Sequence, residues 1–272
     1  MPKVSVIIPC YNQAQYLNES IDSVLASTMQ DFEIIVVNDG STDLESQKIL
    51  HNMKKPKTTI IHQENMGLVG ARNTAIKHAH GKYILPLDSD DKISPDFLEK
   101  ASDYLDQNPD AGIVGGQTEF FGTKSGIWDM GTYSYLQMLR VNILVCSHMF
   151  RRDDWETVGG YNPNMKYGLE DWNFWLDILS LGRKVHQFDQ VMFYYRKHPD
   201  SMITTIQKER HHQMVMQVIE NHIDVYKKHP LIMQRLSGNL SLQTRALDFV
   251  VRMFCLLIPF KSIRHKIKDS FR

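Results

Sequence analysis

Three acidic side chains that could share one cation lie almost side by side in this sequence: Asp88, Asp90 and Asp91, with only Ser89 among them. Neighbouring carboxylates raise each other's pKa, so such a cluster is unfavourable unless positive charge compensates it. Mg²⁺ or Mn²⁺ would do so, because these ions take oxygen ligands and often share them with a substrate's phosphates. The cluster follows a short apolar segment, 83–87, that is predicted as a buried strand. Open α/β sheets bind ligands at the carboxyl ends of their strands, which favours a metal site of the DXD type.

A plainer interpretation stays open for the same residues. Ser94 and Pro95 can occupy the N-cap and the first position of a helix. The acidic residues before them would then belong to a solvated turn. The position at the end of a strand, rather than the triplet itself, is what favours the metal.

The elements before this cluster alternate between strand and helix. Apolar, β-branched segments predict strands at 4–8, 32–37, 58–61 and 83–87. Helical spacing of apolar residues predicts helices at 17–28, after residue 42, and at 69–80. Asn12 with Gln15, and Thr42 with Glu45, have the spacing of capping boxes. This alternation predicts βαβ units and a doubly wound sheet.

The pattern is less regular after the cluster. We expect a helix at 97–105 and a strand at 112–121, followed by short elements from 128 to 195. A break at 199–206 precedes a helix-rich segment. We therefore predict an α/β domain at 1–205 and a helical C-terminal extension at 206–272.

Further polar residues follow the predicted strands. Pro9, Tyr11 and Asn12 follow the first strand, where the tyrosine ring could lie against a planar base, although a simple helix entry also fits. Asp39 follows the second strand and could accept a hydrogen bond from a base or sugar, or form an Asx-type turn beside a glycine. The segment 67–73 opens a helix, and its amides and guanidinium could hold phosphate.

Two more candidate groups lie far downstream. Glu170, Asp171 and Trp172 head an amphipathic helix. Acidic residues are common in a first helical turn because they complement the helix dipole. The alternative is that Asp171 is a general base in a cleft. His198, after the aromatic strand 193–195, could ligate a metal or contact a phosphate, although a lone histidine is more often structural.

The composition is that of an ordinary globular protein, with 42% hydrophobic and 23% charged residues and a formal net charge of zero. Nothing in it favours nucleic-acid binding. The three cysteines, Cys10, Cys146 and Cys255, are scattered and lack metal-ligand spacing, which favours reduced thiols in a cytoplasmic protein. We find no signal peptide and no apolar segment long enough to span a bilayer.

Seven segments, in this order and spacing, resemble an inverting glycosyltransferase of family 2 with the GT-A fold. They are VSVIIPCYNQAQYL, IIVVNDGSTD, ENMGLVGARNTAI, GKYILPLDSDD, VGGYNP, GLEDWNFWL and YYRKHPDSM. Each is weak alone, but together they are specific and cover residues 2–201. The resemblance implies a Rossmann-like, mixed and mainly parallel sheet with helices on both faces.

The resemblance also implies roles for individual residues. The nucleotide side of the site would comprise Pro9, Tyr11, Asn12, Asp39, Asn65, Gly70, Arg72, Asp88 and Ser89. Within it, Asp39 would face a pyrimidine, Arg72 would lie near the diphosphate, and Asp88 near the ribose. Asp90 and His198 would hold Mn²⁺ or Mg²⁺. Asp171 would be the catalytic base, with Glu170 and Trp172 shaping the acceptor site.

The segment 247–260 is apolar and is followed by a basic stretch up to residue 272. A helix lying on an anionic membrane would look like this, and so would a C-terminal helix docked on the domain or on a second copy in a homodimer. We favour peripheral contact of 247–272 with the cytoplasmic face of a membrane, because lipid-linked acceptors are common in the family.

The sequence therefore predicts a metal-dependent transferase that uses a nucleotide-diphospho-sugar, with a UDP-sugar as the expected donor. The acceptor would be a carbohydrate or a lipid-linked saccharide, in the synthesis of a surface polysaccharide, lipopolysaccharide or other glycoconjugate. Two alternatives remain: a nucleotidyltransferase of similar fold, and a non-catalytic nucleotide-sugar-binding partner of an assembly complex. The first would need a basic triphosphate-binding loop, which we do not find between Pro9 and Ser20.

Overall fold

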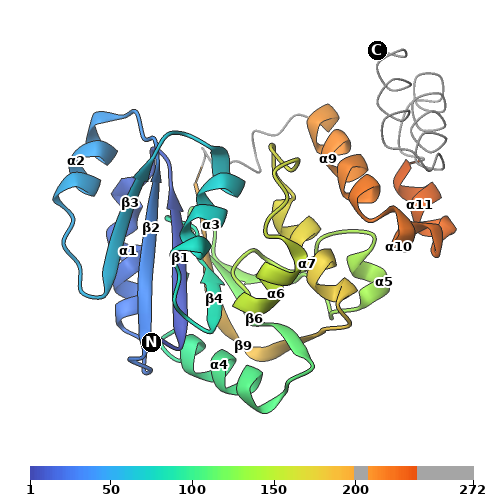
Figure 1. Cartoon of the computed structure of the whole chain (residues 1–272), viewed down its shortest axis with the longest axis horizontal. Coiled ribbons are helices and arrows are strands. Elements are labelled where there is room, and N and C mark those ends of the chain that lie inside the picture. The colour runs from blue at the N-terminus through green and yellow to red at the C-terminus, as the bar shows by residue number, and fades with distance from the viewer. Residues whose placement is uncertain (199–207, 238–272) are drawn as a thin grey trace. The chain divides into compact units, whose positions relative to one another are not determined.

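A computed structural model of the chain describes residues 1–198 and 208–237 (Figure 1). The chain divides into two compact units, 1–221 and 222–272. The larger unit carries the sheet and every candidate site residue. The described part of the smaller unit consists of two short helices, α10 (Ile223–Lys227) and α11 (Pro230–Ser237).

The strands of the larger unit are β1 (Val4–Cys10), β2 (Phe32–Asp39), β3 (Thr58–Gln63), β4 (Tyr83–Pro86), β5 (Lys92–Ile93), β6 (Ala111–Gly122), β7 (Gly126–Trp128), β8 (Met149–Arg151) and β9 (Lys184–Lys197). Its helices are α1 (Ala14–Leu25), α2 (Leu44–Asn52), α3 (Gly67–Lys77), α4 (Phe97–Gln107), α5 (Tyr135–Met138), α6 (Arg152–Val158), α7 (Glu170–Ser180) and α9 (Lys208–Asn221).

One mixed sheet organises these elements, in the order β3-β2-β1-β4-β8-β6-β9-β5, with β7 paired to β6. The first four strands are parallel. Helices α1 and α2 pack on one face of this parallel half, and α3 packs against β1 and β2 on the other (Figure 1). The predicted α/β class and the parallel order of the early strands are confirmed.

The alternation of side chains along β1 explains why both faces can be covered. Val6 and Ile8 join the core cluster that contains Leu17 and Ile21 of α1. Ile7 points to the opposite face, and all of these side chains are fully buried. A strand that is apolar on both faces is stable only between two layers of helices, as a parallel sheet provides.

The second half of the sheet is antiparallel in part and curls back towards the first. β8 runs antiparallel to β4 and β6, and β5 pairs antiparallel with the end of β9. β4 and β5 are separated by three other strands in the sheet, but in the sequence only the five-residue segment 87–91 connects them. At about 3.4 Å per residue this link spans at most about 17 Å, so the end of β9 must lie close to the end of β4.

The local predictions at helix starts need correction. Asn12 is not an N-cap: it has a left-handed backbone (φ 55°), and its side-chain oxygen accepts hydrogen bonds from the backbone amides of Thr42 and Asp43. The N-cap of α2 is Asp43, which accepts from the Ser46 amide at 2.7 Å, and not Thr42. The capping-box spacing therefore did not predict the N-caps of these two helices. At Asn12 the reason is a contact with the loop after β2, which is distant in sequence.

The N-cap of α4 is Asp96, two residues after the predicted Ser94. Ser94 instead donates its hydroxyl to the Asp96 carboxylate at 2.7 Å. The plainer interpretation of the acidic triplet was a solvated turn that leads directly into a helix beginning at Ser94. Such a turn would need no bound ligand. The short strand β5 comes between the triplet and the helix, so the triplet belongs to the β4–β5 link.

The C-terminal part of the chain is only partly described. α9 belongs to the larger unit. The side-chain amide of Asn221 in α9 donates a hydrogen bond to the side-chain oxygen of Asn173 in α7 at 2.6 Å. The proposed extension at 206–272 stays a prediction, and the segment 247–272 lies outside the described residues. Across 1–198 and 208–237, we find no helix of the length and apolarity that a bilayer crossing requires.

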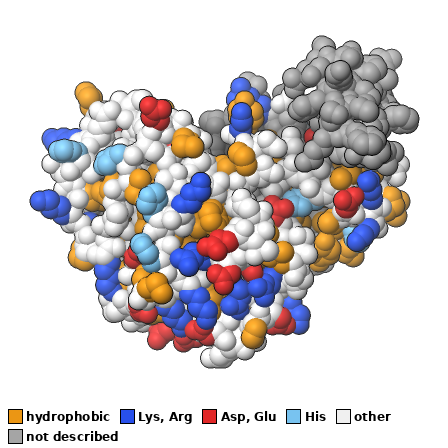
Figure 2. Space-filling view, in the orientation of Figure 1, with side chains coloured by type: hydrophobic (Ala, Val, Ile, Leu, Met, Phe, Trp, Pro, Cys, Tyr) orange, Lys and Arg blue, Asp and Glu red, His pale blue; other side chains and the backbone are white. Residues whose placement is uncertain are grey.

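The surface carries charges of both signs. Figure 2 shows acidic and basic side chains intermixed over the lower part of the face it displays. On α4, Asp103 and Asp106 pair with Lys3, and Asp106 also pairs with Lys82. These partly exposed pairs contribute little to stability individually, because water screens them.

Candidate active site at the end of strand β4

The three carboxylates after β4 have different partners. Asp88 accepts from the Arg72 guanidinium at 2.8 Å, and its other oxygen accepts from the Cys146 thiol at 3.4 Å. Asp91 is buried, and one of its oxygens accepts from the Arg196 amide at 2.8 Å. Burial and the charge of Asp90 raise the pKa of Asp91 well above its usual range. Asp88 and Asp91 are thus both held by the protein around them.

Asp90 is placed differently, because its carboxylate meets the ring of His198. The distance from Asp90 Oδ2 to His198 Nε2 is 3.0 Å, although the two residues are 108 positions apart in the sequence. Burial and the charge of Asp88 raise the pKa of Asp90, and the histidine partly offsets this. The curl of the sheet, which returns the end of β9 to the end of β4, creates this pair.

The Asp90 carboxylate suits Mn²⁺ or Mg²⁺, which prefer oxygen ligands, whereas the His198 imidazole is a ligand of transition metals, so Mn²⁺ fits this pair better than Mg²⁺. No group of three His, Cys, Asp or Glu side chains that could hold a metal occurs in the described part of the chain. Asp90 and His198 would supply only part of the coordination shell of such an ion, and Mg²⁺ usually takes its other ligands from a substrate's phosphates and from water.

Arg72 of α3 lies beneath the cluster and is 1% exposed. Its guanidinium donates to Asp88 at 2.8 Å and to Glu170 at 2.5 Å, and thereby joins the end of β4 to the start of α7. Burial alone would lower the pKa of Arg72, but the charges of Asp88 and Glu170 outweigh it and raise the pKa well above its usual range. The predicted contact of Arg72 with a diphosphate stays a prediction.

The next residue of α3 makes a second link to the same region. The side chain of Asn73 donates to the Tyr161 carbonyl at 2.8 Å and accepts from the Tyr161 amide at 2.9 Å. The ring of Tyr161 is buried and lies 5.6 Å from the Arg72 guanidinium carbon. Helix α3 thus fixes the segment that leads into α7.

Asp171 lies at the start of α7, beside Glu170. One of its oxygens accepts from the Asn142 amide at 3.0 Å, and the other accepts from the Trp172 backbone at 2.7 Å. The protein that surrounds Asp171 and the charge of Glu170 raise its pKa to about 7, while Arg72 opposes the shift. A carboxylate with such a pKa can take up a proton near neutral pH, as a general base must.

At the end of β1, Tyr11 is 46% exposed, and its ring is available to a ligand. Pro9 is buried within β1, opposite Val37 of β2, so it shapes the strand end instead. Asn12 ties the loop after β1 to the loop after β2 through the contacts described above. Of these three residues, Tyr11 has the most exposed side chain, and its stacking on a base stays a prediction.

Asp39 is buried at the end of β2. One of its oxygens accepts from the Gln63 side chain at 2.6 Å and from the Met66 amide at 2.8 Å. Its second oxygen has no partner among the described residues and remains available to a ligand. Asn65 is exposed beside it, and a Cβ at Gly40 would lie only 2.8 Å from the Asn65 nitrogen. Glycine with a φ of 70° is required there so that the two loops can touch.

Ser89 and Trp172 are less accessible than the sequence suggested, whereas Gly70 is partly exposed. A Cβ at Gly70 would lie 2.4 Å from the Met66 side chain. Ser89 is buried, and the Trp172 indole donates to the Met138 carbonyl at 2.7 Å from within the core. Trp172 therefore holds α5 against α7, and a substrate contact for it has no support in this geometry.

Asn142 and Cys146 contact the predicted site, but sequence reasoning did not identify them. Both lie between α5 and β8, in a stretch without regular elements. A thiol in an apolar run such as NILVCSH is ordinarily structural, so the sequence carries no signal that would assign Cys146 to the donor site.

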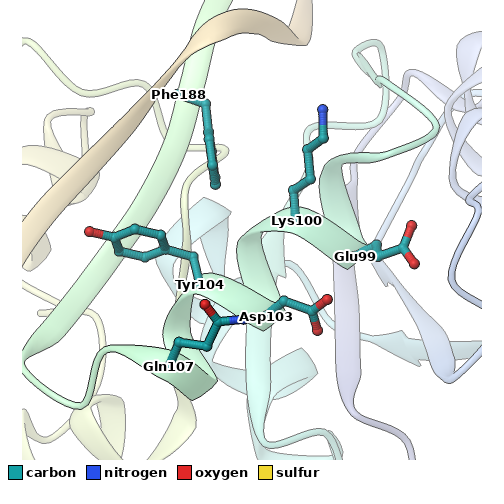
Figure 3. A pocket seen from close by; sticks show the side chains of 6 residues that line it. All are labelled: Glu99, Lys100, Asp103, Tyr104, Gln107 and Phe188. Atoms are coloured by element: carbon teal, nitrogen blue, oxygen red, sulfur yellow. The ribbon is translucent and has the colours of Figure 1, made fainter.

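A separate hollow of about 460 Å³ lies between α4 and the start of β9 (Figure 3). Phe188 and Tyr104 line it in an edge-to-face contact, with ring centroids 5.8 Å apart, and charged side chains of α4 line it as well. None of the candidate site residues belongs to it. The site described above is therefore defined by its side-chain contacts rather than by this hollow.

The family of the chain follows from a comparison with protein-family models. The model described as glycosyl transferase family 2 matches residues 5–167, more than half of the chain. The chain belongs to glycosyltransferase family 2. The resemblance predicted from the seven motifs is thereby confirmed.

Relatives of this family 2 chain include several bacterial proteins. It is 32% identical over 225 residues to EpsJ of Bacillus subtilis (strain 168), which is described as an uncharacterized glycosyltransferase. The aligned region covers 74% of this chain and 63% of EpsJ. It is 28% identical over 242 residues to a chondroitin synthase of Escherichia coli, and the aligned region covers 85% of this chain and 35% of the synthase. The chain thus spans less than two thirds of the length of these relatives.

Among solved structures, the family 2 chain is similar to Staphylococcus aureus TarS, residues 1–349, in complex with UDP-GlcNAc. The TM-score is 0.65 at 22% identity, and the match covers 80% of this chain and 65% of that one. This similarity confirms the expected fold.

We predict that Arg72→Met lowers the free energy of unfolding by about 3–5 kcal/mol, because it leaves Glu170 and Asp88 without their shared cation. Equilibrium unfolding in urea measures the change. The control is Lys184→Met, which breaks an exposed pair with Asp110 and should cost less than about 1 kcal/mol. Equal losses in the two variants would show that the Arg72 bridge contributes no more than a surface pair.

Proposed function

We propose that this domain transfers a sugar from a UDP-sugar to an acceptor hydroxyl, with inversion at the anomeric carbon, in polysaccharide or glycoconjugate synthesis. The observation that carries the proposal is the pair of links around Arg72. Asp88 of the acidic cluster and Glu170, the neighbour of Asp171, bind the same guanidinium. The loop that carries the acidic cluster and the helix start that carries the candidate base are thereby held at one place.

The donor half supports a nucleotide. The exposed ring of Tyr11 offers a stacking surface, and the free oxygen of Asp39 offers a hydrogen-bond acceptor at the neighbouring strand end. The similar TarS structures contain UDP-GlcNAc and UDP, which supports a uridine nucleotide for this chain also. The donor would then lie across the carboxyl ends of β1, β2 and β4, where open α/β sheets bind ligands.

In this proposal Asp90 and His198 hold a divalent cation. When bound, the cation would act as a Lewis acid that neutralises the charge developing on the departing diphosphate. Asp88 keeps its contact with Arg72, and Asp91 keeps its contact with the Arg196 amide, so both support the loop without taking part. A fixed loop places Asp90 without a reorganisation cost during the reaction.

The acceptor half requires a base. An alcohol is a weak nucleophile, and Asp171 would take its proton as the oxygen attacks the anomeric carbon. The amide of Asn142 orients one oxygen of Asp171. A single displacement inverts the anomeric carbon, so one carboxylate suffices at the reacting sugar, whereas a glycosidase needs two.

The substitution Asp171→Asn tests the base. We expect UDP binding to be retained and turnover to fall by about 10²–10⁴-fold, because the amide cannot accept the proton. In the unchanged protein, turnover should fall as the pH drops through about 7, since Asp171 becomes protonated there. Measurement of initial rates from pH 5 to pH 9 on both proteins gives the two results together.

The matched control is Asp177→Asn on the same helix. Burial raises the pKa of Asp177 to about 7 as well, and its carboxylate accepts a hydrogen bond from the Asn173 side chain of the same helix. This control should keep its turnover and its pH profile. Unchanged rates in Asp171→Asn would remove Asp171 from the proposed role, and a non-catalytic nucleotide-sugar-binding domain would then fit better.

Removal of metal tests the cation. EDTA should abolish turnover, and Mn²⁺ or Mg²⁺ should restore it. Asp90→Asn should raise the metal concentration needed for half-maximal rate by about tenfold or more, since a ligand carboxylate is lost. Asp22→Asn, at an exposed pair with Lys55, serves as the control and should leave that concentration unchanged. Full activity in EDTA would contradict the assignment of Asp90.

A further inference from the structure

Three aromatic rings gather where the β6–β7 hairpin meets the end of β9. Trp128 stacks on Phe120 with ring centroids 4.9 Å apart, and Tyr195 lies edge-on to both, at 5.3 Å from Trp128 and 6.1 Å from Phe120. The strand register produces this cluster, because Phe120 is paired with Tyr195 and Trp128 with Thr118. Trp128 and Tyr195 remain partly exposed.

Two ammonium groups lie over these rings. Lys124 Nζ is 4.0 Å from the centroid of Phe120, and Lys197 Nζ is 5.0 Å from Tyr195 and 5.9 Å from Trp128. Neither lysine forms an ion pair within the described residues, whereas Lys3, Lys92 and Lys184 each have a carboxylate partner. We call Lys124, Lys197, Phe120, Trp128 and Tyr195 the cationic aromatic patch.

The backbone fixes both lysines at this place. The amide and the hydroxyl of Thr123 both donate to the Lys197 carbonyl, at 3.0 and 2.9 Å. The preceding Gly122 has a φ of 89°, and a Cβ there would lie 2.7 Å from the same carbonyl. The turn that carries Lys124 is therefore built against the end of β9, which brings the backbones of the two lysines together.

The patch adjoins the acidic cluster. The residue after Tyr195, Arg196, donates its amide to Asp91, and His198 contacts Asp90. Burial raises the pKa of Tyr195, and the charges of Asp91 and Asp88 raise it further, which places the phenol within electrostatic reach of the cluster. The two lysines, which form no ion pair with the described residues, thus belong to segments that adjoin the proposed reaction centre.

We propose that the cationic aromatic patch binds the acceptor, and that the acceptor carries an anionic group, a carboxylate or a phosphate, next to a sugar ring. One face of a pyranose consists of C–H groups and packs on an aromatic surface such as that of Trp128, which removes apolar area from water. The ammonium groups supply charge complementary to the anion. The inference rests on the proposed function, because it assumes that the neighbouring cluster binds the donor.

Binding of three small probes to the full chain, with UDP and Mg²⁺ present, tests the proposal. The probes are methyl β-D-glucoside, methyl β-D-glucuronide and methyl β-D-glucoside 6-phosphate, and ligand-observed NMR titration measures their affinities at low salt. We expect the two acidic probes to bind about tenfold or more tightly than the neutral one, as a charge-assisted contact provides. The order of the two acidic probes distinguishes carboxylate from phosphate.

Substitutions identify the groups responsible. Lys124→Gln with Lys197→Gln should abolish the preference for the acidic probes, while Trp128→Ala should weaken all three probes. Lys48→Ala, at an exposed position on α2, is the control and should change nothing. The single variant Lys124→Gln, on the exposed turn, should reduce the preference even if the double variant is poorly folded.

Two results would overturn the proposal. Equal binding of acidic and neutral probes by the unchanged protein would leave the lysines without an anionic acceptor. A loss of UDP affinity in the lysine variants, without a change in probe selectivity, would assign them to the donor's diphosphate instead. Failure of the unchanged protein to bind UDP would count against the proposed function and not against the patch, which the probe comparison tests separately.

Discussion

The bridge from Arg72 to Asp88 and Glu170 is the interaction on which the site depends. A guanidinium that is 1% exposed is costly to bury, and it is stable there because it has two carboxylate partners. Those partners lie 82 residues apart, one after β4 and one at the start of α7. The bridge therefore fixes the distance between the acidic cluster and Asp171, and disruption of either contact leaves an uncompensated buried charge.

The curl of the sheet is the second constraint. Because the link 87–91 joins β4 to β5, and β5 pairs with the end of β9, the residues after β9 return to the acidic cluster. This brings His198 to Asp90 and places the cationic aromatic patch beside the same loop. The first, parallel half of the sheet thus carries the proposed nucleotide side, and the second, mixed half supplies His198 and the surface that we assign to the acceptor.

Local sequence patterns predicted the parallel half well, because an apolar run such as Val4–Ile8 can be buried only as a strand covered on both faces. They failed where contacts distant in sequence decide: Asn12 binds the loop after β2 instead of capping α1, and Trp172 is held in the core by the Met138 carbonyl. The partners of Asp171 and Asp88, Asn142 and Cys146, lie in an irregular segment whose conformation has no periodic signal. The candidate residues were therefore predictable by type, but not by what they contact.

The most direct test of this account is a crystal structure of the full chain with UDP and Mn²⁺. We expect the diphosphate and the metal at Asp90 and His198, the Asp171 carboxylate on the same cleft, and Arg72 still bound to both Asp88 and Glu170. A metal held by other residues, or an Arg72 side chain that leaves Glu170 when the nucleotide binds, would contradict the claim that this buried cation holds the two halves of the site together.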